Sequence, residues 1–342
     1  MKKLVHLLLA AAMTVTGVLG VAAQDDDSAL GEGIGGSAIY IDERGNHVAT
    51  LEVTGVEAGW SDYDDRGAPT RGYDFHAVHM VITNESDSPL EVNPSRFSLV
   101  DTNGLNNSRK NVRLAETSAS DVLSDAANLE AGETLERTLV FELFSDVSPA
   151  VFMWQPGGGK LVAVNVSDGS AEESAVAVGL NTPAVFTDER GNVVGSVEVT
   201  EVVDGWDEFR ERSDPDRGMR YVAVHFTVTN LSDASLEVNP FNLSLLDTES
   251  TNNGRSYVSA AETATTQITS DSLDVAPGES FSGMIVYTLF DGVDATALMW
   301  QPGYGVIAMV ILGESEGDAT PEVEDTDVVE DEEEDVVATP AA

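Results

Sequence analysis

The sequence predicts an all-β protein made of two tandem antiparallel β-sandwiches. Three observations lead to this prediction. A long segment occurs twice at a fixed offset of 146 residues, its apolar residues alternate with a period of two, and the same turn residues punctuate both copies. No long stretch has a helical period, and there is no cysteine that could form a disulfide bond. Each copy must therefore hold itself together by packing sheets.

The repeat is visible in landmarks that contain turns, tryptophans or an Asn-Pro pair. They are 42–46 and 188–192, Trp60 and Trp206, 90–94 and 236–240, and 154–157 and 300–303. No insertion separates the copies, because the offset is the same at every landmark. A unit of this length can bury its own core, which predicts two domains in tandem and excludes a solenoid of short repeats.

The chain begins like an export signal. Lys2 and Lys3 precede an apolar run over 4–19, and Val21-Ala22-Ala23 supplies small side chains for cleavage before Gln24. An uncleaved membrane anchor is the alternative, although the run is short for a bilayer span. The complete division that we expect is a signal peptide over 1–23, a flexible lead over 24–36, a first sandwich over 37–167, a linker over 168–182, a second sandwich over 183–312 and a disordered acidic tail over 313–342.

Strands and turns follow from local patterns within each copy. Residues 221–228 alternate between apolar and mostly polar side chains, which indicates a half-buried strand. Gly and Asn in 44–46 suit a tight hairpin turn, and Pro-Gly in 276–279 suits a type II turn. Trp154 and Trp300 each stand just before a Pro-Gly pair, so we expect them to close the ends of the two cores.

These strand and turn signatures resemble a known family. The pattern over 221–230, the Ser-Asp pair at 232–233 and the turn at 276–279 look like the bacterial domain of unknown function 4352, and 73–84 with 131–133 repeat the pattern in the first copy. The resemblance implies immunoglobulin-like sandwiches on exported or lipid-anchored proteins and carries over no catalytic residues. The chain lacks the cysteine that would carry a lipid anchor.

Charge narrows the classes of partner. The chain has 17 basic and 60 acidic residues, a net charge of −43. Such a surface repels phosphate backbones and anionic membranes, so neither nucleic-acid binding nor membrane insertion after signal cleavage is expected. Cationic partners, including divalent metal ions, are compatible with it. Solubility or adaptation to salt is an alternative reason for the acidity.

The candidate binding residues are a tryptophan and the start of the loop that follows it, at equivalent places in the two copies. Trp60 and Trp206 follow a glycine and lead into a charged loop that contains Tyr63 or Phe209. An exposed tryptophan there would stack on a sugar ring or anchor a protein. Burial in the core is the alternative.

The same loops supply the candidate metal ligands. Calcium is the metal considered, because carboxylate oxygens are its preferred ligands. The pattern departs from an EF-hand, since Arg66 and Tyr73 occupy places where that motif needs acids. The candidate ligands are Asp62, Asp64, Asp65, Asp207, Asp214 and Asp216.

The function that we expect is that of a non-catalytic, exported binding protein, secreted or held at the cell envelope, that presents loops to an extracellular protein or glycan. A structural spacer of the envelope and a calcium-dependent surface module are the alternatives. No cofactor is expected apart from calcium. An enzyme is not expected, because no Gly-x-Ser-x-Gly elbow precedes a predicted helix, the usual setting of a serine nucleophile.

Overall fold

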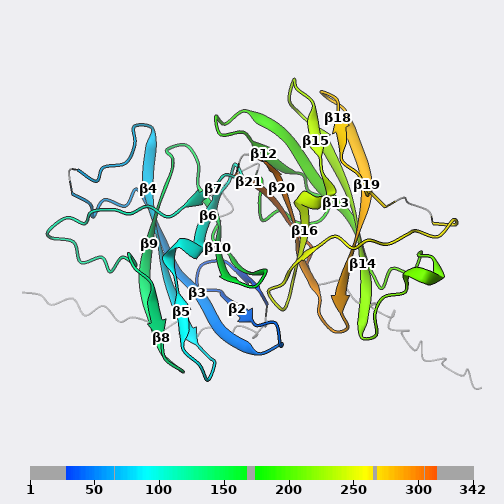
Figure 1. Cartoon of the computed structure of the whole chain (residues 1–342). Coiled ribbons are helices and arrows are strands. Elements are labelled where there is room, and N and C mark those ends of the chain that lie inside the picture. The colour runs from blue at the N-terminus through cyan, green and yellow to red at the C-terminus, as the bar shows by residue number, and fades with distance from the viewer. Residues whose placement is uncertain (1–27, 65, 168–173, 265–267, 304, 314–342) are drawn as a thin grey trace, which may run out of the picture.

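The computed structural model describes residues 28–64, 66–167, 174–264, 268–303 and 305–313. These residues form two β-sandwiches, one per copy of the repeat, that stand side by side (Figure 1). The predicted all-β class and the antiparallel sandwich are therefore confirmed. The expected signal peptide and nearly all of the acidic tail lie outside the described residues.

The first copy contains strands β1 to β11 and one short 3-10 helix. Their bounds are β1 Leu30–Glu32, β2 Ser37–Ile41, β3 His47–Ala58, β4 Tyr73–Asn84, β5 Leu90–Val92, η1 Pro94–Arg96, β6 Phe97–Asp101, β7 Asn106–Ser108, β8 Ala127–Leu129, β9 Thr134–Phe144, β10 Pro149–Gly157 and β11 Lys160–Asn165.

The second copy repeats this order from β12 to β21, with two short 3-10 helices. Their bounds are β12 Ala184–Thr187, β13 Val193–Asp204, η2 Glu211–Ser213, β14 Met219–Asn230, β15 Leu236–Val238, η3 Pro240–Asn242, β16 Leu243–Asp247, β17 Asn252–Gly254, β18 Leu273–Val275, β19 Ser280–Phe290, β20 Ala295–Gly303 and β21 Val306–Ile311.

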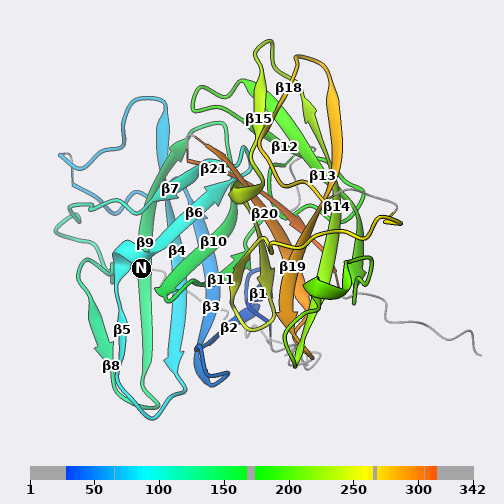
Figure 2. The same cartoon turned by 45° about the vertical axis from the view of Figure 1, so that its right-hand side comes forward.

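Each sandwich has two facing sheets. In the first copy the sheet orders are β2-β3-β4-β9 and β1-β11-β10-β6-β7, and in the second they are β12-β13-β14-β19 and β17-β16-β20-β21. The strands pair antiparallel except β1, which runs parallel to β11 (Figure 2). The alternation seen in the sequence places one face of β4 and of β14 in the core.

The predicted turns and core tryptophans are confirmed. Asp42 Oδ1 accepts hydrogen bonds from the backbone N–H groups of Arg44 and Asn46, which closes the β2–β3 hairpin. Gly278 has a φ of +74°, the left-handed conformation that a type II turn requires at this place. Trp154 and Trp300 are fully buried. Trp154 makes an edge-to-face contact with Tyr40 of β2, and Trp300 makes the equivalent contact with Phe186 of β12.

Two expected boundaries are wrong. The lead over 24–36 contains β1, whose Leu30 is buried, and the linker over 168–182 contains Ala175 and Val176, which are also buried. Backbone bonds explain both: Ala163 N donates to Ala29 O, and Met309 N donates to Ala175 O, each at 2.9 Å. Each repeat therefore begins with an edge segment, at about residue 28 and residue 174, that the sequence division assigned to a connection.

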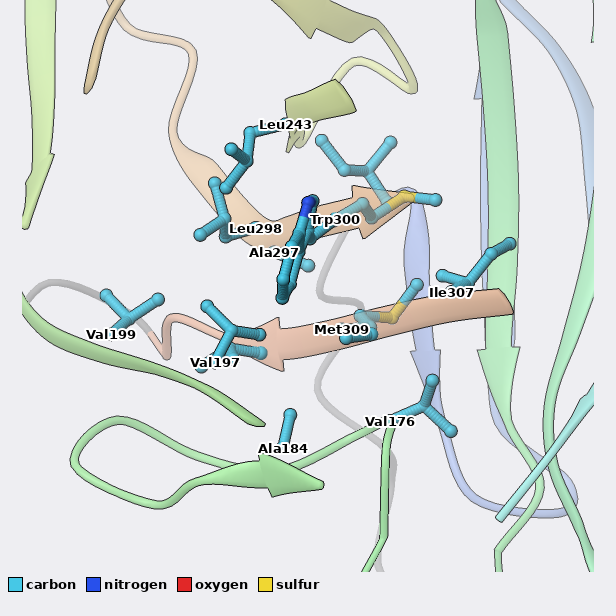
Figure 3. Packing of buried hydrophobic residues seen from close by; sticks show 14 of the residues in the cluster. Val176, Ala184, Val197, Val199, Leu243, Ala297, Leu298, Trp300, Ile307 and Met309 are labelled. Atoms are coloured by element: carbon cyan, nitrogen blue, oxygen red, sulfur yellow. The ribbon is translucent and has the colours of Figure 1, made fainter. Parts of the chain in front are cut away.

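The two sandwiches share a hydrophobic core, which independent modules on a linker would not. One cluster of buried side chains combines the second core with the outer face of β10 and β11, including Val151, Met153 and Ala163. Figure 3 shows part of this cluster around Trp300 and Met309. The sheet β1-β11-β10-β6-β7 is thus covered on both faces, and its apolar runs are continuous for that reason.

The contact between copies obeys a local two-fold relationship, since equivalent residues exchange equivalent backbone bonds. The N–H of Ile307 donates to Gly104 O and that of Leu161 to Ser250 O, at 2.7 and 2.8 Å. Gly104 has a φ of +87°, and a Cβ there would lie 2.7 Å from the Ile307 oxygen, so a side chain at this position would clash. The two copies pack as a fused dimer.

Candidate functional site

The candidate binding residues of the first copy form a small buried cluster. Trp60 is 2% exposed, and its ring centroid lies 6.1 Å from that of Tyr63 and 6.3 Å from that of Phe75. Tyr63 and Phe75 are in edge-to-face contact at 5.3 Å. This cluster lies on the outer face of the sheet, where the loop after β3 folds over β4. Of the two alternatives for Trp60, exposure to a ligand and burial in the protein, the structure shows burial.

The second copy repeats the arrangement. Trp206 is 5% exposed and lies 6.0 Å from Phe209 and 6.3 Å from Tyr221, centroid to centroid. The Tyr221 hydroxyl donates to Ser213 O at 2.8 Å. Burying rings of this size stabilises a long loop that has little regular structure. Trp60 and Trp206 thus fasten loops to sheets, and their rings are not available to stack on a ligand.

The candidate calcium ligands of the first copy are engaged with protein groups. Asp62 Oδ2 accepts hydrogen bonds from the hydroxyls of Ser120 and Ser118, at 2.6 and 3.3 Å. Asp64 Oδ2 lies 2.8 Å from Arg113 Nε. Asp65 lies outside the described residues.

No group of three or more metal-ligating side chains forms in the part of the chain that the structure describes. Asp207, Asp214 and Asp216, the candidates of the second copy, therefore form no such group either. The calcium prediction therefore gains no support from these residues.

An exposed aromatic patch occurs elsewhere, on the edge of the second sandwich. Phe241 in η3 is 61% exposed and Tyr257, just after β17, is 80% exposed. The guanidinium of Arg255 lies against both rings, 4.2 Å from the Phe241 centroid and 4.5 Å from the Tyr257 centroid, and the two centroids are 6.3 Å apart. Such cation–π contacts fix the guanidinium in place. We call these three residues the aromatic patch.

The first copy has no such patch. Ser95 and Asn111 stand where the second copy has Phe241 and Tyr257, at the offset of 146. Arg109, the counterpart of Arg255, donates to Asn111 Oδ1 and to Ser124 O. Sequence reasoning missed the patch, although this difference between the copies is a signal for it.

Arg255 differs from its counterpart in its hydrogen bonding. Its Nε is buried without a hydrogen-bond partner. Contact with the faces of two rings positions the guanidinium but satisfies none of its hydrogen-bond donors. The patch therefore combines exposed apolar area with a held cation.

A large cleft opens at one end of the second sandwich, with a volume of about 1080 Å³. Its walls come from the β12–β13 hairpin, the 231–237 loop and the end of β20, and they expose Val193 and Leu231. Its charged lining residues are Asp188, Glu189, Arg190, Asp233, Glu237 and Asp274. The cleft is wide, predominantly acidic and open to solvent.

The fold defines a class: an all-β protein made of two tandem antiparallel β-sandwiches. The chain belongs to the family described as "Domain of unknown function (DUF4352)", whose model matches residues 45–155 and 193–306. The two matched regions correspond to the two copies, so the resemblance inferred from the strand and turn signatures is confirmed.

Solved structures from Bacillus species are similar to parts of the chain. The yjhA protein of Bacillus subtilis is 13% identical with a TM-score of 0.30, over 40% of this chain and 98% of its own. A conserved hypothetical protein of Bacillus anthracis is 15% identical with a TM-score of 0.26, over 39% and 89%. The ycdA protein, a candidate lipoprotein of Bacillus subtilis, is 11% identical with a TM-score of 0.29, over 53% and 71%.

A comparison with curated proteins gave no match. Within the described ranges, none of the helices has the length and apolarity needed to cross a bilayer.

Proposed function

We propose that this chain is an exported, non-catalytic binding protein that docks a partner protein through the aromatic patch of its second domain. Export rests on the signal-like first 23 residues. The observation that carries the docking role is the pair of exposed rings around Arg255. Aromatic and arginine side chains are the types that dominate the energetics of protein interfaces.

The chemistry of the patch indicates what the partner presents. A guanidinium held against two rings loses little side-chain entropy when it binds, and its free donors match the two oxygens of a carboxylate. Phe241 and Tyr257 add apolar area around it. The partner should therefore carry an Asp or Glu side chain bordered by apolar residues. Phe241 follows Pro240 in η3, and Pro240 is buried.

The first copy supplies the matched substitutions for a test. Phe241→Ser with Tyr257→Asn converts the patch to the residues of the first copy. Both side chains are exposed, so we expect little change in stability. The immobilised wild-type chain should retain a protein from the envelope fraction of its source that the double variant loses, and free carboxylate peptide carrying apolar neighbours should compete.

Two outcomes would decide against docking of a protein through this patch. The first is that the wild-type chain and the double variant retain the partner protein equally. The second is that the double variant loses binding to a glycan array but still retains the protein, which would assign the two rings to carbohydrate binding.

The second candidate function is that of a spacer in the cell envelope. One observation favours it: the shared core fixes the two sandwiches against each other. A spacer needs that rigidity and no exposed patch. Retention of no partner by the wild-type chain, together with an extended rigid shape in small-angle scattering, would support this function.

A further inference from the structure

A pocket in the first copy lies at the end of its core, where the inward row of β4 turns polar. Residues of one strand face alternate sides, so Val78, Met80 and Ile82 share the inner face with His76 and Asp74. The three apolar residues belong to the core of the first sandwich. His76 and Asp74 continue the row into a pocket of about 350 Å³.

The walls of this pocket come from several elements of the first copy and carry polar and apolar surface in similar amounts. Val56, Val147 and Val166 supply apolar side chains, and Asp74, His76 and Ser148 supply polar ones. Asp74 is the charged residue of the lining. A volume in this range, with apolar side chains beside a few polar groups, is typical of small-molecule sites.

His76 is the unusual group of the pocket. It is 5% exposed, and its Nδ1 is buried without a hydrogen-bond partner. Burial lowers the pKa of His76, an effect that the nearby Asp74 carboxylate opposes. A buried polar atom without a partner destabilises the folded state, so its presence needs a reason. Val222 occupies the same place in the second copy, and its side chain has no polar atom that needs a hydrogen bond.

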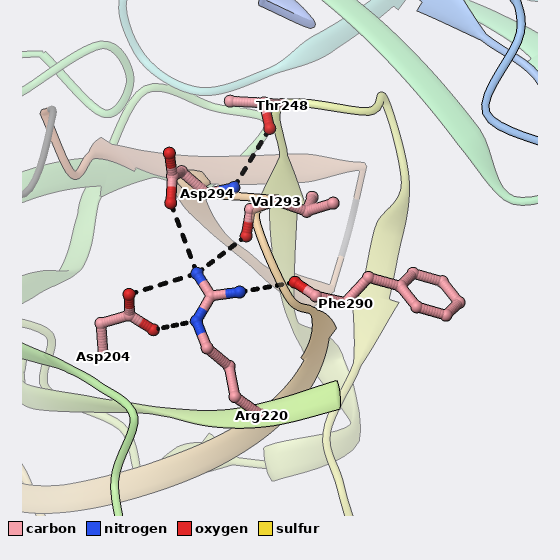
Figure 4. Close-up of polar contacts among 6 residues, drawn as sticks. All are labelled: Asp204, Arg220, Thr248, Phe290, Val293 and Asp294. Carbon is pink, nitrogen blue, oxygen red and sulfur yellow. Dashed lines mark hydrogen bonds and ion pairs between the residues drawn. The ribbon is translucent and has the colours of Figure 1, made fainter. Parts of the chain in front are cut away.

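In the second copy an arginine side chain fills the equivalent place. Arg220 stands where the first copy has Asp74, and its guanidinium contacts both oxygens of Asp204 and one oxygen of Asp294 (Figure 4). Its Nη1 and Nη2 donate to the carbonyl oxygens of Phe290 and Val293. The space left there is about 30 Å³.

The first copy keeps the shape of this place but lacks the arginine. Phe144 and Val147 are the counterparts of the two residues whose carbonyls accept from Arg220. The turn is the same, since Val147 N donates to Phe144 O at 3.2 Å, as Val293 N does to Phe290 O. The carboxylates of the second copy are replaced by Ala58 and Ser148, and a carboxylate enters instead at Asp74. The pocket thus has one acid and space where the other copy has a cation.

We propose that this pocket binds a small organic cation, an ammonium or guanidinium group on a short apolar body. The cationic head would pair with Asp74, and the apolar body would lie along Val56, Val147 and Val166. The net charge of −43 raises the concentration of cations near the surface. This site is separate from the aromatic patch and does not depend on the docking role proposed for it.

The experiment is a calorimetric titration of the full chain with n-butylguanidinium and n-butylammonium, with n-butanol and butyrate as the neutral and anionic counterparts. We expect saturable binding of the two cations alone, with a Kd of about 1 mM or below. Asp74→Asn keeps the shape and removes the charge, and it should weaken binding at least about tenfold. Phe241→Ser, on the aromatic patch, should leave the affinity unchanged.

His76→Val provides a second test with a different signature. It installs the residue of the second copy and removes a buried polar atom without a partner, so the thermal midpoint should rise. Cation binding should weaken, because the cation loses its contact with the ring of His76, which lines the pocket together with Asp74. Three results would overturn the proposal. They are no saturable binding of either cation, equal binding of n-butanol, and an affinity that neither Asp74→Asn nor His76→Val alters.

Discussion

The amine of Lys160 donates a hydrogen bond to Thr251 Oγ1 at 3.0 Å, from the first copy of the domain to the second. It also donates to Glu249 O at 3.0 Å, and the residue is buried. At the place related by the local two-fold, Val306 pairs with Leu105. One half of the contact is thus polar and the other apolar. This difference favours packing of the first copy against the second over packing of two identical copies.

This asymmetry predicts the effect of exchanging the polar pair. Lys160→Val should lower the free energy of unfolding by about 1–2 kcal/mol, because two acceptors lose their donor. Lys160→Val with Thr251→Leu copies the apolar half and should recover most of this loss. Urea denaturation of both variants measures the coupling. A single variant as stable as the wild type would show that the buried amine contributes nothing.

The shared core predicts that neither copy is stable alone. A fragment over 28–167 would expose the outer face of β10 and β11, including Val151 and Met153, which the second copy covers. We expect this fragment to bind a hydrophobic dye and to be protected from protease only when the fragment over 174–313 is added. If each fragment resists protease equally well with and without the other, the two copies are independent.

Acid should stabilise the chain between about pH 4 and 6 through Asp101. Burial raises the pKa of Asp101 to about 6 from 3.8, although hydrogen bonds from Asn107 and from backbone N–H groups oppose the rise. The folded chain then binds this proton more tightly than the unfolded chain. The resulting stability is present below the unfolded pKa and is lost as the pH rises through 6, by about 2–3 kcal/mol.

Asp101→Asn provides the control, because it removes this titration and leaves the general relief of repulsion among the other acids. The slope of unfolding free energy against pH should be smaller in the variant over that window. Parallel slopes would mean that the Asp101 carboxyl titrates near its ordinary value in the folded chain. Asp247, the counterpart in the second copy, has its pKa raised by burial as well and remains in both proteins.

Trp60→Ala should act on stability and not on partner binding. The ring is buried against Tyr63 and Phe75, so its loss should cost about 3–5 kcal/mol. Phe241→Ala, at an exposed ring, should change stability by less than about 1 kcal/mol. Thermal denaturation compares the two directly. A Trp60→Ala variant of normal stability that no longer binds its partner would restore the tryptophan to a binding role.

Local pattern was sufficient for most of the fold. The alternation over 221–228 predicted a strand, the Gly and Asn of 44–46 predicted a hairpin, and the repeat predicted two domains. Continuous apolar runs at 149–154 and 161–164 also carried a signal, since a strand with one wet face alternates. Those runs belong to the sheet that the second copy covers.

The candidate sites were harder to predict because exposure is not a local property. The glycine and charged residues around Trp60 suit a surface loop, yet that loop folds back over the sheet and buries the ring. Asp74 and His76 sit in a strand whose period is plain in the sequence, but only the comparison with Arg220 in the folded second copy shows that their place is open.

By itself, the sequence determined the strands, the turns, the family and the number of copies, because these depend on residues close together in the chain. Only the tertiary structure decided which faces are covered, where the copies meet and which polar groups lack a partner. Those features depend on contacts between residues far apart in the sequence, such as Lys160 and Thr251, and no local period encodes them.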